Sequence, residues 1–148
     1  MITITNIRNK NLNSKNFDQI WSIVRSNKNL NFTQVPELAP STELFKYYLN
    51  MSKLNQFDDV AFNEVYVPQF IDEFTTVGKN LLKYLRQLDM AGKNIALVCY
   101  CADESKCHRS IIAGILQGMK VNVTTDTEAD YSHYYEQFLK VHGKKNKS

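Results

Sequence analysis

The chain has 148 residues, 43% of them hydrophobic, and a formal net charge of +3. This length allows one domain with its own core. No uninterrupted apolar run approaches the roughly 18 residues that a membrane-spanning helix needs, and the first residues lack the basic flank and apolar block of a secretory signal. The sequence therefore predicts a soluble, cytoplasmic protein with no membrane partner.

The first third of the chain predicts short elements. Residues 2–5 alternate apolar and polar side chains, which is typical of a strand. Ser14 is predicted to cap a short helix that carries Phe17, Ile20 and Trp21, although residues 22–25 could instead form a buried strand. Periodicity alone leaves both alternatives open. Residues 27–31 are expected to form a loop.

Three helices are expected next, after a segment at 35–40 that two prolines should keep extended. Ser41 is predicted to cap the first helix, whose apolar residues recur at helical spacing. Two more helices are predicted at residues 63–74 and 76–90, and Gly92 should end the second of them. The apolar positions of the first helix are Leu44, Phe45, Tyr48 and Leu49.

The following residues predict a strand–loop–helix–strand unit. Residues 95–100 form a near-continuous apolar run typical of a buried central strand. A loop at 102–106, a helix at 108–117 and a strand at 121–124 follow, and a last helix should begin at Asp126 or Thr127. The order predicts a single-domain α/β fold of Rossmann-like three-layer type with a mostly parallel sheet. Its domain should span residues 1–142.

The C-terminal residues 143–148 are expected to be a basic flexible tail, because lysines cluster there. Such a cluster could contact phosphate backbones. No basic stripe interleaved with aromatic residues accompanies it, so no nucleic-acid partner is expected.

All three cysteines lie between positions 99 and 107, which argues against a disulfide framework. Cys99, Cys101, Cys107 and His108 are suitable ligand types for zinc. Adjacent ligands at 107 and 108 make tetrahedral binding awkward, and no two-residue spacer separates the cysteines. No metal or other cofactor is therefore expected, with zinc as the alternative. A cysteine phosphatase is also disfavoured, because no cysteine stands six positions before Arg109.

The start of the helix at 108 predicts an anion site. In parallel sheets, ligands bind beyond the carboxyl ends of strands, and amides at a helix N-terminus bind anions. Arg109 adds a planar charged fork. The neighbouring His108 and Arg109 should lower the pKa of Cys107 and make it a nucleophile. In the alternative interpretation, His108 bonds a carbonyl and Arg109 pairs with an acid of the preceding loop.

This segment resembles the family named domain of unknown function 488. The resemblance rests on an apolar strand ending in cysteine, an acidic loop and Cys107-His108-Arg109-Ser110, with a second signature at Leu38-Ala39-Pro40-Ser41. It covers about residues 2–119 and implies a compact Rossmann-like α/β fold with a site at 107–109. Family members usually carry Asp-Val-Arg at an early strand end. Here Ile23-Val24-Arg25 stands there, so the arginine remains and the acid does not. The resemblance also implies a bacterial or bacteriophage source.

Together these features predict a site for a phosphate-bearing small molecule, of nucleotide or nucleotide-sugar type. In an enzyme, Cys107 would be the nucleophile or His108 the general acid or base, assisted by Asp103 or Glu104, in a cysteine- or histidine-dependent hydrolase or transferase. The ligand would be held by a larger group, namely Arg109, Ser110, Arg25, Arg8, Cys101 and a base-stacking Tyr100.

Two alternatives remain open. A non-catalytic protein could sequester the same ligand, as a viral counter-defence protein would. An interaction module could instead use the tyrosines of the last helix, which are Tyr131, Tyr134 and Tyr135.

Overall fold

The sheet is the centre of the molecule, and all its strand pairs are parallel. The computed structural model describes residues 1–25 and 32–147, so the loop expected at 27–31 lies outside the described residues. Within them the strand order is β3-β2-β4-β1-β5. The strands are β1 (Ile2–Asn6), β2 (Gln19–Ser22), β3 (Thr33–Gln34), β4 (Ile95–Cys99) and β5 (Val123–Thr125).

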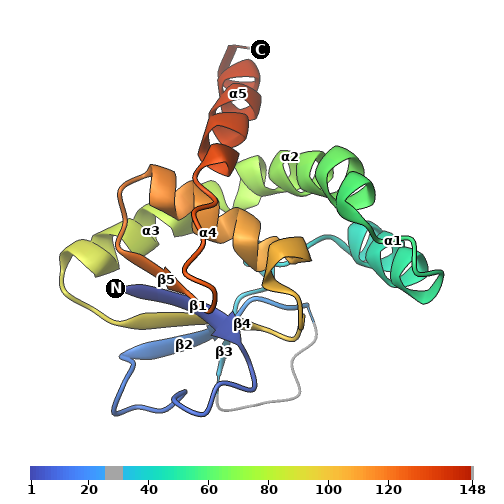
Figure 1. The fold of residues 1–148 in the computed structure, drawn as a ribbon. Coiled ribbons are helices and arrows are strands. Elements are labelled where there is room, and N and C mark those ends of the chain that lie inside the picture. Colours follow the sequence, from blue (N-terminus) through green and yellow to red (C-terminus); the bar gives the residue numbers. More distant parts are fainter. Residues whose placement is uncertain (26–31, 148) are drawn as a thin grey trace.

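Helices pack with this sheet in layers (Figure 1). α4 contacts β1, β4 and β5, and it also contacts α5 and α2. The molecule is therefore an α/β protein of Rossmann-like three-layer type, as predicted. The helices are α1 (Thr42–Lys53), α2 (Val67–Val77), α3 (Lys79–Met90), α4 (His108–Gly118) and α5 (His133–Lys147). A π-helical turn at Ala61–Tyr66 leads into α2, and 3-10 turns lie at Pro36–Leu38 and Glu104–Lys106.

Several predicted elements are confirmed. Ser41 caps α1, and its hydroxyl accepts a hydrogen bond from the amide of Leu44 at 3.1 Å. β4 is buried at every residue, and α3 ends before Gly92, whose φ of 78° suits glycine. The helix predicted at 108–117 is α4.

Three local predictions are wrong. Residues 14–21 form no helix, because the side chain of Asn13 accepts the amides of Lys15 and Asn16 in a turn and β2 then pairs with β4. The segment at 35–40 contains a 3-10 turn.

The third wrong prediction concerns the start of the last helix, which begins at His133 rather than at Asp126 or Thr127. Both of these side chains are engaged elsewhere, since Asp126 pairs with Arg109 and Thr127 donates to Glu104. At the other end, α5 runs to Lys147, so the backbone of the expected tail is helical over residues 143–147.

The core fixes α4 against both the sheet and the segment before α5. All its residues from His108 to Leu116 are buried. The α4 helix lies very close to that segment, because a Cβ on Gly114 would stand 1.9 Å from the carbonyl oxygen of Tyr131. This packing places the N-terminus of α4 beside the carboxyl ends of β1 and β4. Among the described residues, no helix is both long and apolar enough to cross a membrane.

Candidate active site

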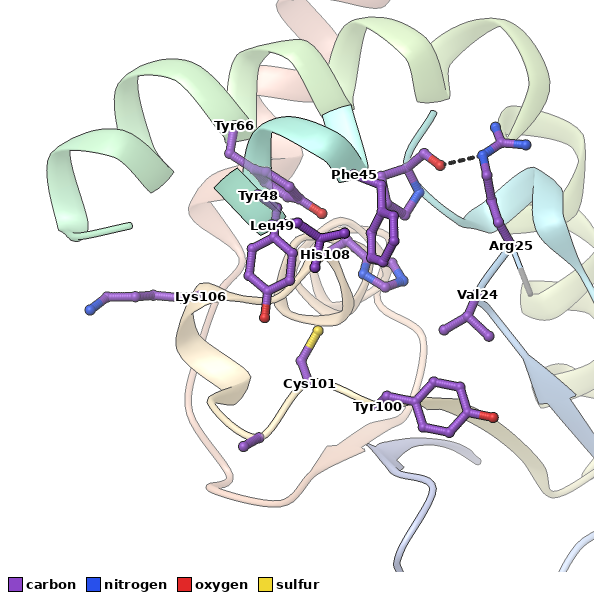
Figure 2. Close-up of a pocket in the computed structure, with 12 residues that line it drawn as sticks. Val24, Arg25, Phe45, Tyr48, Leu49, Tyr66, Tyr100, Cys101, Lys106 and His108 are labelled. Carbon is purple, nitrogen blue, oxygen red and sulfur yellow. Dashed lines mark hydrogen bonds between the residues drawn. The ribbon is translucent and has the colours of Figure 1, made fainter. Parts of the chain in front are cut away.

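A cavity of about 530 Å³ opens where β2 and β4 end, between α1 and the loop that follows β4 (Figure 2). Its volume is in the range of small-molecule sites. Most of the wall is aromatic or aliphatic, and a few polar groups converge on it. The lining residues are Val24, Arg25, Pro40, Phe45, Tyr48, Leu49, Tyr66, Tyr100, Cys101, Ala102, Lys106 and His108.

The α1 helix supplies one wall. Phe45 and Leu49 are 44% and 43% exposed although they lie in the apolar pattern of the helix, because that face borders the cavity instead of the core. The hydroxyl of Tyr48 points toward the sulfur of Cys101 (Figure 2). The sequence predicts these residues only as apolar positions of a helix, and the structure places them in the cavity wall.

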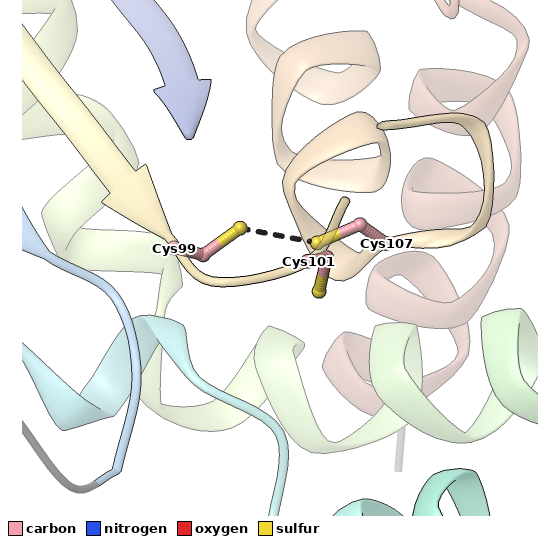
Figure 3. A group of neighbouring side chains, drawn as sticks. All are labelled: Cys99, Cys101 and Cys107. Carbon is pink, nitrogen blue, oxygen red and sulfur yellow. Dashed lines mark hydrogen bonds between the residues drawn. The ribbon is translucent and has the colours of Figure 1, made fainter. Parts of the chain in front are cut away.

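The sulfur atoms of Cys99, Cys101 and Cys107 form the thiol cluster, which lies between the end of β4 and the start of α4 (Figure 3). All three lie within 4.8 Å of one another, and the sulfurs of Cys99 and Cys107 are 3.2 Å apart. Cys99 and Cys107 are buried, whereas Cys101 is partly exposed and lines the cavity. None of the three forms a disulfide. A ligand in the cavity can therefore reach the sulfur of Cys101 alone.

The backbone of Cys101 is held by two donors. Its carbonyl oxygen accepts hydrogen bonds from Asn6 Nδ2 at 2.7 Å and from the guanidinium of Arg109 at 3.3 Å. Asn6 ends β1 and Arg109 begins α4, so two elements far apart in the sequence fix this loop. The position of the sulfur therefore follows from the fold.

The environment favours the thiolate of Cys101. Hydrogen bonds from the thiols of Cys107 and Cys99, together with the positive charge of Arg109, lower the pKa of Cys101 from 9.0 to about 4. The other two thiols behave in the opposite way. Burial raises the pKa of Cys107 well above its usual value, and the hydrogen bond to Cys101 raises the pKa of Cys99 to about 11. The thiolate at this site belongs to Cys101.

His108 is held as a neutral ring beneath the cavity. Its Nε2 lies 2.7 Å from the carbonyl oxygen of Ile23, and its Nδ1 lies 3.6 Å from the sulfur of Cys107. A carbonyl oxygen only accepts, so Nε2 carries the proton and Nδ1 presents a lone pair to Cys107. Burial lowers the pKa of His108 below 6.5, which also favours the neutral ring.

Arg109 lies behind the thiol cluster and outside the cavity wall. It is 2% exposed, and its Nη1 is 2.9 Å from a carboxylate oxygen of Asp126. Sequence reasoning named an acid of the preceding loop as an alternative partner, but the partner comes from the segment after β5. Arg109 thus acts on Cys101 through its charge and through one carbonyl contact.

A second buried acid joins the same two loops. Glu104 is 4% exposed, and its carboxylate accepts the amide of Asp126 at 2.9 Å and the hydroxyl of Tyr131 at 2.8 Å, as well as the hydroxyl of Thr127. This network ties the loop after β4 to the segment before α5. The contacts of Glu104 were not predicted from the sequence, because acidic residues in loops are ordinarily exposed.

The other predicted site residues fall into separate places. Ser110 is fully buried and donates to the carbonyl of Cys107 at 2.8 Å, so it stabilises the start of α4. Tyr100 is 48% exposed and borders the cavity. Asp103 is exposed, and its carboxylate accepts the amide of Ser105. Arg8 is exposed and does not line the cavity.

Two cations stand at the cavity rim. The Nε of Arg25 donates to the carbonyl of Pro40 at 2.6 Å. The ammonium of Lys106 is 3.6 Å from a carboxylate oxygen of Asp59, a residue whose side chain is 85% exposed. An exposed pair of this kind contributes little to stability, so an incoming anion can replace it.

The thiol cluster also has the donor type for a thiophilic cation such as Zn²⁺. The Nδ1 of His108 lies 3.6 Å from the sulfur of Cys107, but His108 does not join the cluster of donors, which consists of the three thiols. The three thiols fit zinc better than their spacing in the sequence suggested.

The fold and the site define a Rossmann-like α/β protein with a thiolate at the floor of an aromatic cavity. A family model, DUF488-N3a, described as the active DUF488-N3 subclade, matches residues 6–120. The chain belongs to this family, as the resemblance predicted. Comparison with curated proteins and with solved structures finds no match.

Proposed function

We propose that the chain binds a phosphate-bearing small molecule, of nucleotide or nucleotide-sugar type, in this cavity, and that it hydrolyses or transfers part of it. The observation that carries the proposal is the thiolate of Cys101, which faces an aromatic cavity at the carboxyl ends of parallel strands. Ligands of α/β proteins bind at such edges. The word "active" in the family description agrees with turnover.

Each part of the ligand has a counterpart in the wall. Aromatic faces of Tyr48, Phe45 and Tyr100 suit a planar base. Lys106 and Arg25 at the rim suit the phosphate. The sulfur of Cys101 at the floor would attack the electrophilic atom of the ligand while the bond from that atom to the leaving group breaks. Tyr48, whose hydroxyl lies near the same sulfur, would donate a hydrogen bond to the reacting group. We propose Cys101 as nucleophile in place of Cys107, whose sulfur is buried.

Calorimetry under reducing conditions tests the binding step. The probes are the nucleoside 5′-monophosphates, UDP-glucose and the matching nucleosides. The phosphate-bearing probes should bind, and Lys106→Ala and Arg25→Ala should weaken binding about tenfold each. Arg8→Ala is the matched control and should leave affinity unchanged, since Arg8 lies outside the cavity. Equal binding of nucleosides and nucleotides would reject a phosphate site.

Cys101→Ala separates an enzyme from a sequestering protein. Turnover of a bound probe, followed by chromatography of the products, should disappear in this variant while affinity changes little. A wild-type protein that binds a probe tightly and never alters it would support sequestration.

A further inference from the structure

The thiol cluster combines one accessible sulfur with two buried ones. Cys101 lines the cavity, while Cys99 and Cys107 are 0% and 1% exposed. All three sulfurs lie within 4.8 Å of one another. The two neighbouring thiols stabilise the thiolate of Cys101, and their proximity also places a second sulfur within reach of it. Accessible thiolates with a second thiol in reach are the arrangement found in oxidation-sensitive sites.

We propose that Cys101 is an oxidative modification site, at which a hydroperoxide forms a sulfenic acid that Cys107 then converts into a Cys101–Cys107 disulfide. The inference rests on the proposed function in one respect, because the disulfide would remove the sulfur that is proposed to attack the ligand. Reduction by a small thiol restores that sulfur.

The chemistry balances in two steps. The sulfur of Cys101 attacks the terminal oxygen of the hydroperoxide, the O–O bond breaks, and the departing alkoxide takes up a proton to become an alcohol. The sulfur of Cys107 then attacks the sulfur of Cys101, the S–O bond breaks, and the hydroxide leaves as water with the thiol proton. Two thiols and one hydroperoxide thus give one disulfide, one alcohol and one water.

Cys107 is favoured over Cys99 as the resolving thiol for two reasons. The Nδ1 lone pair of His108 lies 3.6 Å from the sulfur of Cys107 and can accept its proton. Cys99 is held in β4 two residues before Cys101, where extended backbone separates the Cα atoms by about 6.6 Å. That separation is at the upper end of disulfide geometry.

Peptide mapping distinguishes the three cysteines. Trypsin cleaves after Lys106 and Arg109 and chymotrypsin after Tyr100, so the cysteines fall in different peptides. Reduced, chelator-treated protein is exposed to hydrogen peroxide, alkylated and digested with both enzymes. Peptides 101–106 and 107–109 should appear joined, with a mass two hydrogens below their sum, and a reductant should separate them. Cys101 should be consumed at least about tenfold faster than either neighbour.

Variants test each role. Cys107→Ser should leave a sulfenic acid at Cys101 that dimedone traps, and Cys101→Ser should protect the other two thiols. Cys99→Ser is the matched control and should still form the 101–107 bridge. A bridge between Cys99 and Cys107 with Cys101 intact would overturn the proposal, as would direct conversion of wild-type Cys101 to a sulfinic acid.

The test is independent of ligand binding. Nucleotide binding without any disulfide rejects this inference and leaves the proposed function standing. A disulfide without nucleotide binding rejects the proposed function and retains the oxidation chemistry.

Discussion

At the scale of the residue, the main feature of the cavity floor is the negative charge of the Cys101 side chain. Cys101 receives hydrogen bonds from two thiols and lies near the guanidinium of Arg109, which Asp126 holds in place. The two thiols remain protonated, since the pKa of Cys99 is raised to about 11 and burial raises the pKa of Cys107 well above its usual value. One thiolate in a cluster of three is therefore the stable arrangement.

Alkylation measures this charge directly. Because the pKa of Cys101 is lowered to about 4, its thiolate persists at pH 5, and its iodoacetamide rate should differ little between pH 5 and pH 8. An ordinary thiol with a pKa near 9 would slow by about 1,000-fold over that interval. Arg109→Gln should shift the profile of Cys101 toward higher pH, and Arg109→Lys should restore most of it. A tenfold rise per pH unit in the wild type would contradict the assigned thiolate.

Sequence reasoning named Cys107 as the nucleophile, but the sulfur of Cys107 is buried and Cys101 lines the cavity. The order of strand, loop and helix indicated the correct edge of the sheet. The loop from 100 to 106 determines which cysteine faces the cavity. Hydrogen bonds from Asn6 and Arg109 to the carbonyl oxygen of Cys101 set the shape of this loop. Asn6 is 95 residues away from Cys101 along the chain, and no local pattern encodes such a contact.

At the scale of elements, α4 lies in close contact with the segment before α5. A Cβ at Gly114 would lie 1.9 Å from the Tyr131 carbonyl, and one at Gly118 would lie 2.2 Å from the Tyr135 side chain. The backbone carbonyl opposite Gly114 can move less than the side chain opposite Gly118. The Gly114 contact therefore sets how near the Glu104 network lies to α4.

Substitution of two glycines tests this contact. Gly114→Ala should lower the free energy of unfolding by about 1–3 kcal/mol or more, because the methyl group would overlap backbone. Gly143→Ala is the matched control within α5, where no described atom lies within 4 Å of the added Cβ. It should raise stability by up to about 1 kcal/mol through helix propensity. Urea unfolding of both variants gives the comparison, and equal stabilities would refute the close contact.

The sequence predicted long elements better than short ones. α1, α3 and α4 carry clear helical periodicity, α1 also has the Ser41 cap, and β4 is a continuous apolar run. β2 has four residues and is defined by pairing with β4, which outweighs the weak helical pattern there. Asp126 is a good capping residue by type, yet its carboxylate pairs with Arg109 and Thr5 instead.

At the scale of the whole molecule, the fold extends past the matched family region. The family model ends at residue 120, but β5 pairs with β1 and α5 packs on α4 and α2. Tyr134 and Phe138 of α5 are 4% and 5% exposed. The C-terminal residues therefore complete the core.

Two truncations test this requirement. Removal of residues 121–148 should abolish cooperative unfolding, because each lost aromatic side chain contributes about 1.5–3 kcal/mol and total stability is about 5–15 kcal/mol. Removal of residues 143–148 alone should leave a folded protein. Thermal unfolding followed by circular dichroism provides the readout. A cooperative transition in the shorter chain would show that residues 1–120 fold alone.

The strand order has a consequence for biosynthesis. β1 lies between β4 and β5, and Ile2 aligns with Ile95 and with Val123. At about 5–20 residues per second, a ribosome needs roughly 5–20 s to make the residues between β1 and its first partner. Throughout that time β1 has no native neighbour, whereas β2 has β3 as a partner that is made earlier than β4. The nascent chain thus exposes β1 until the cysteine-bearing strand β4 is made, and the sulfur of Cys101 follows directly after the strand that joins β1 to β2.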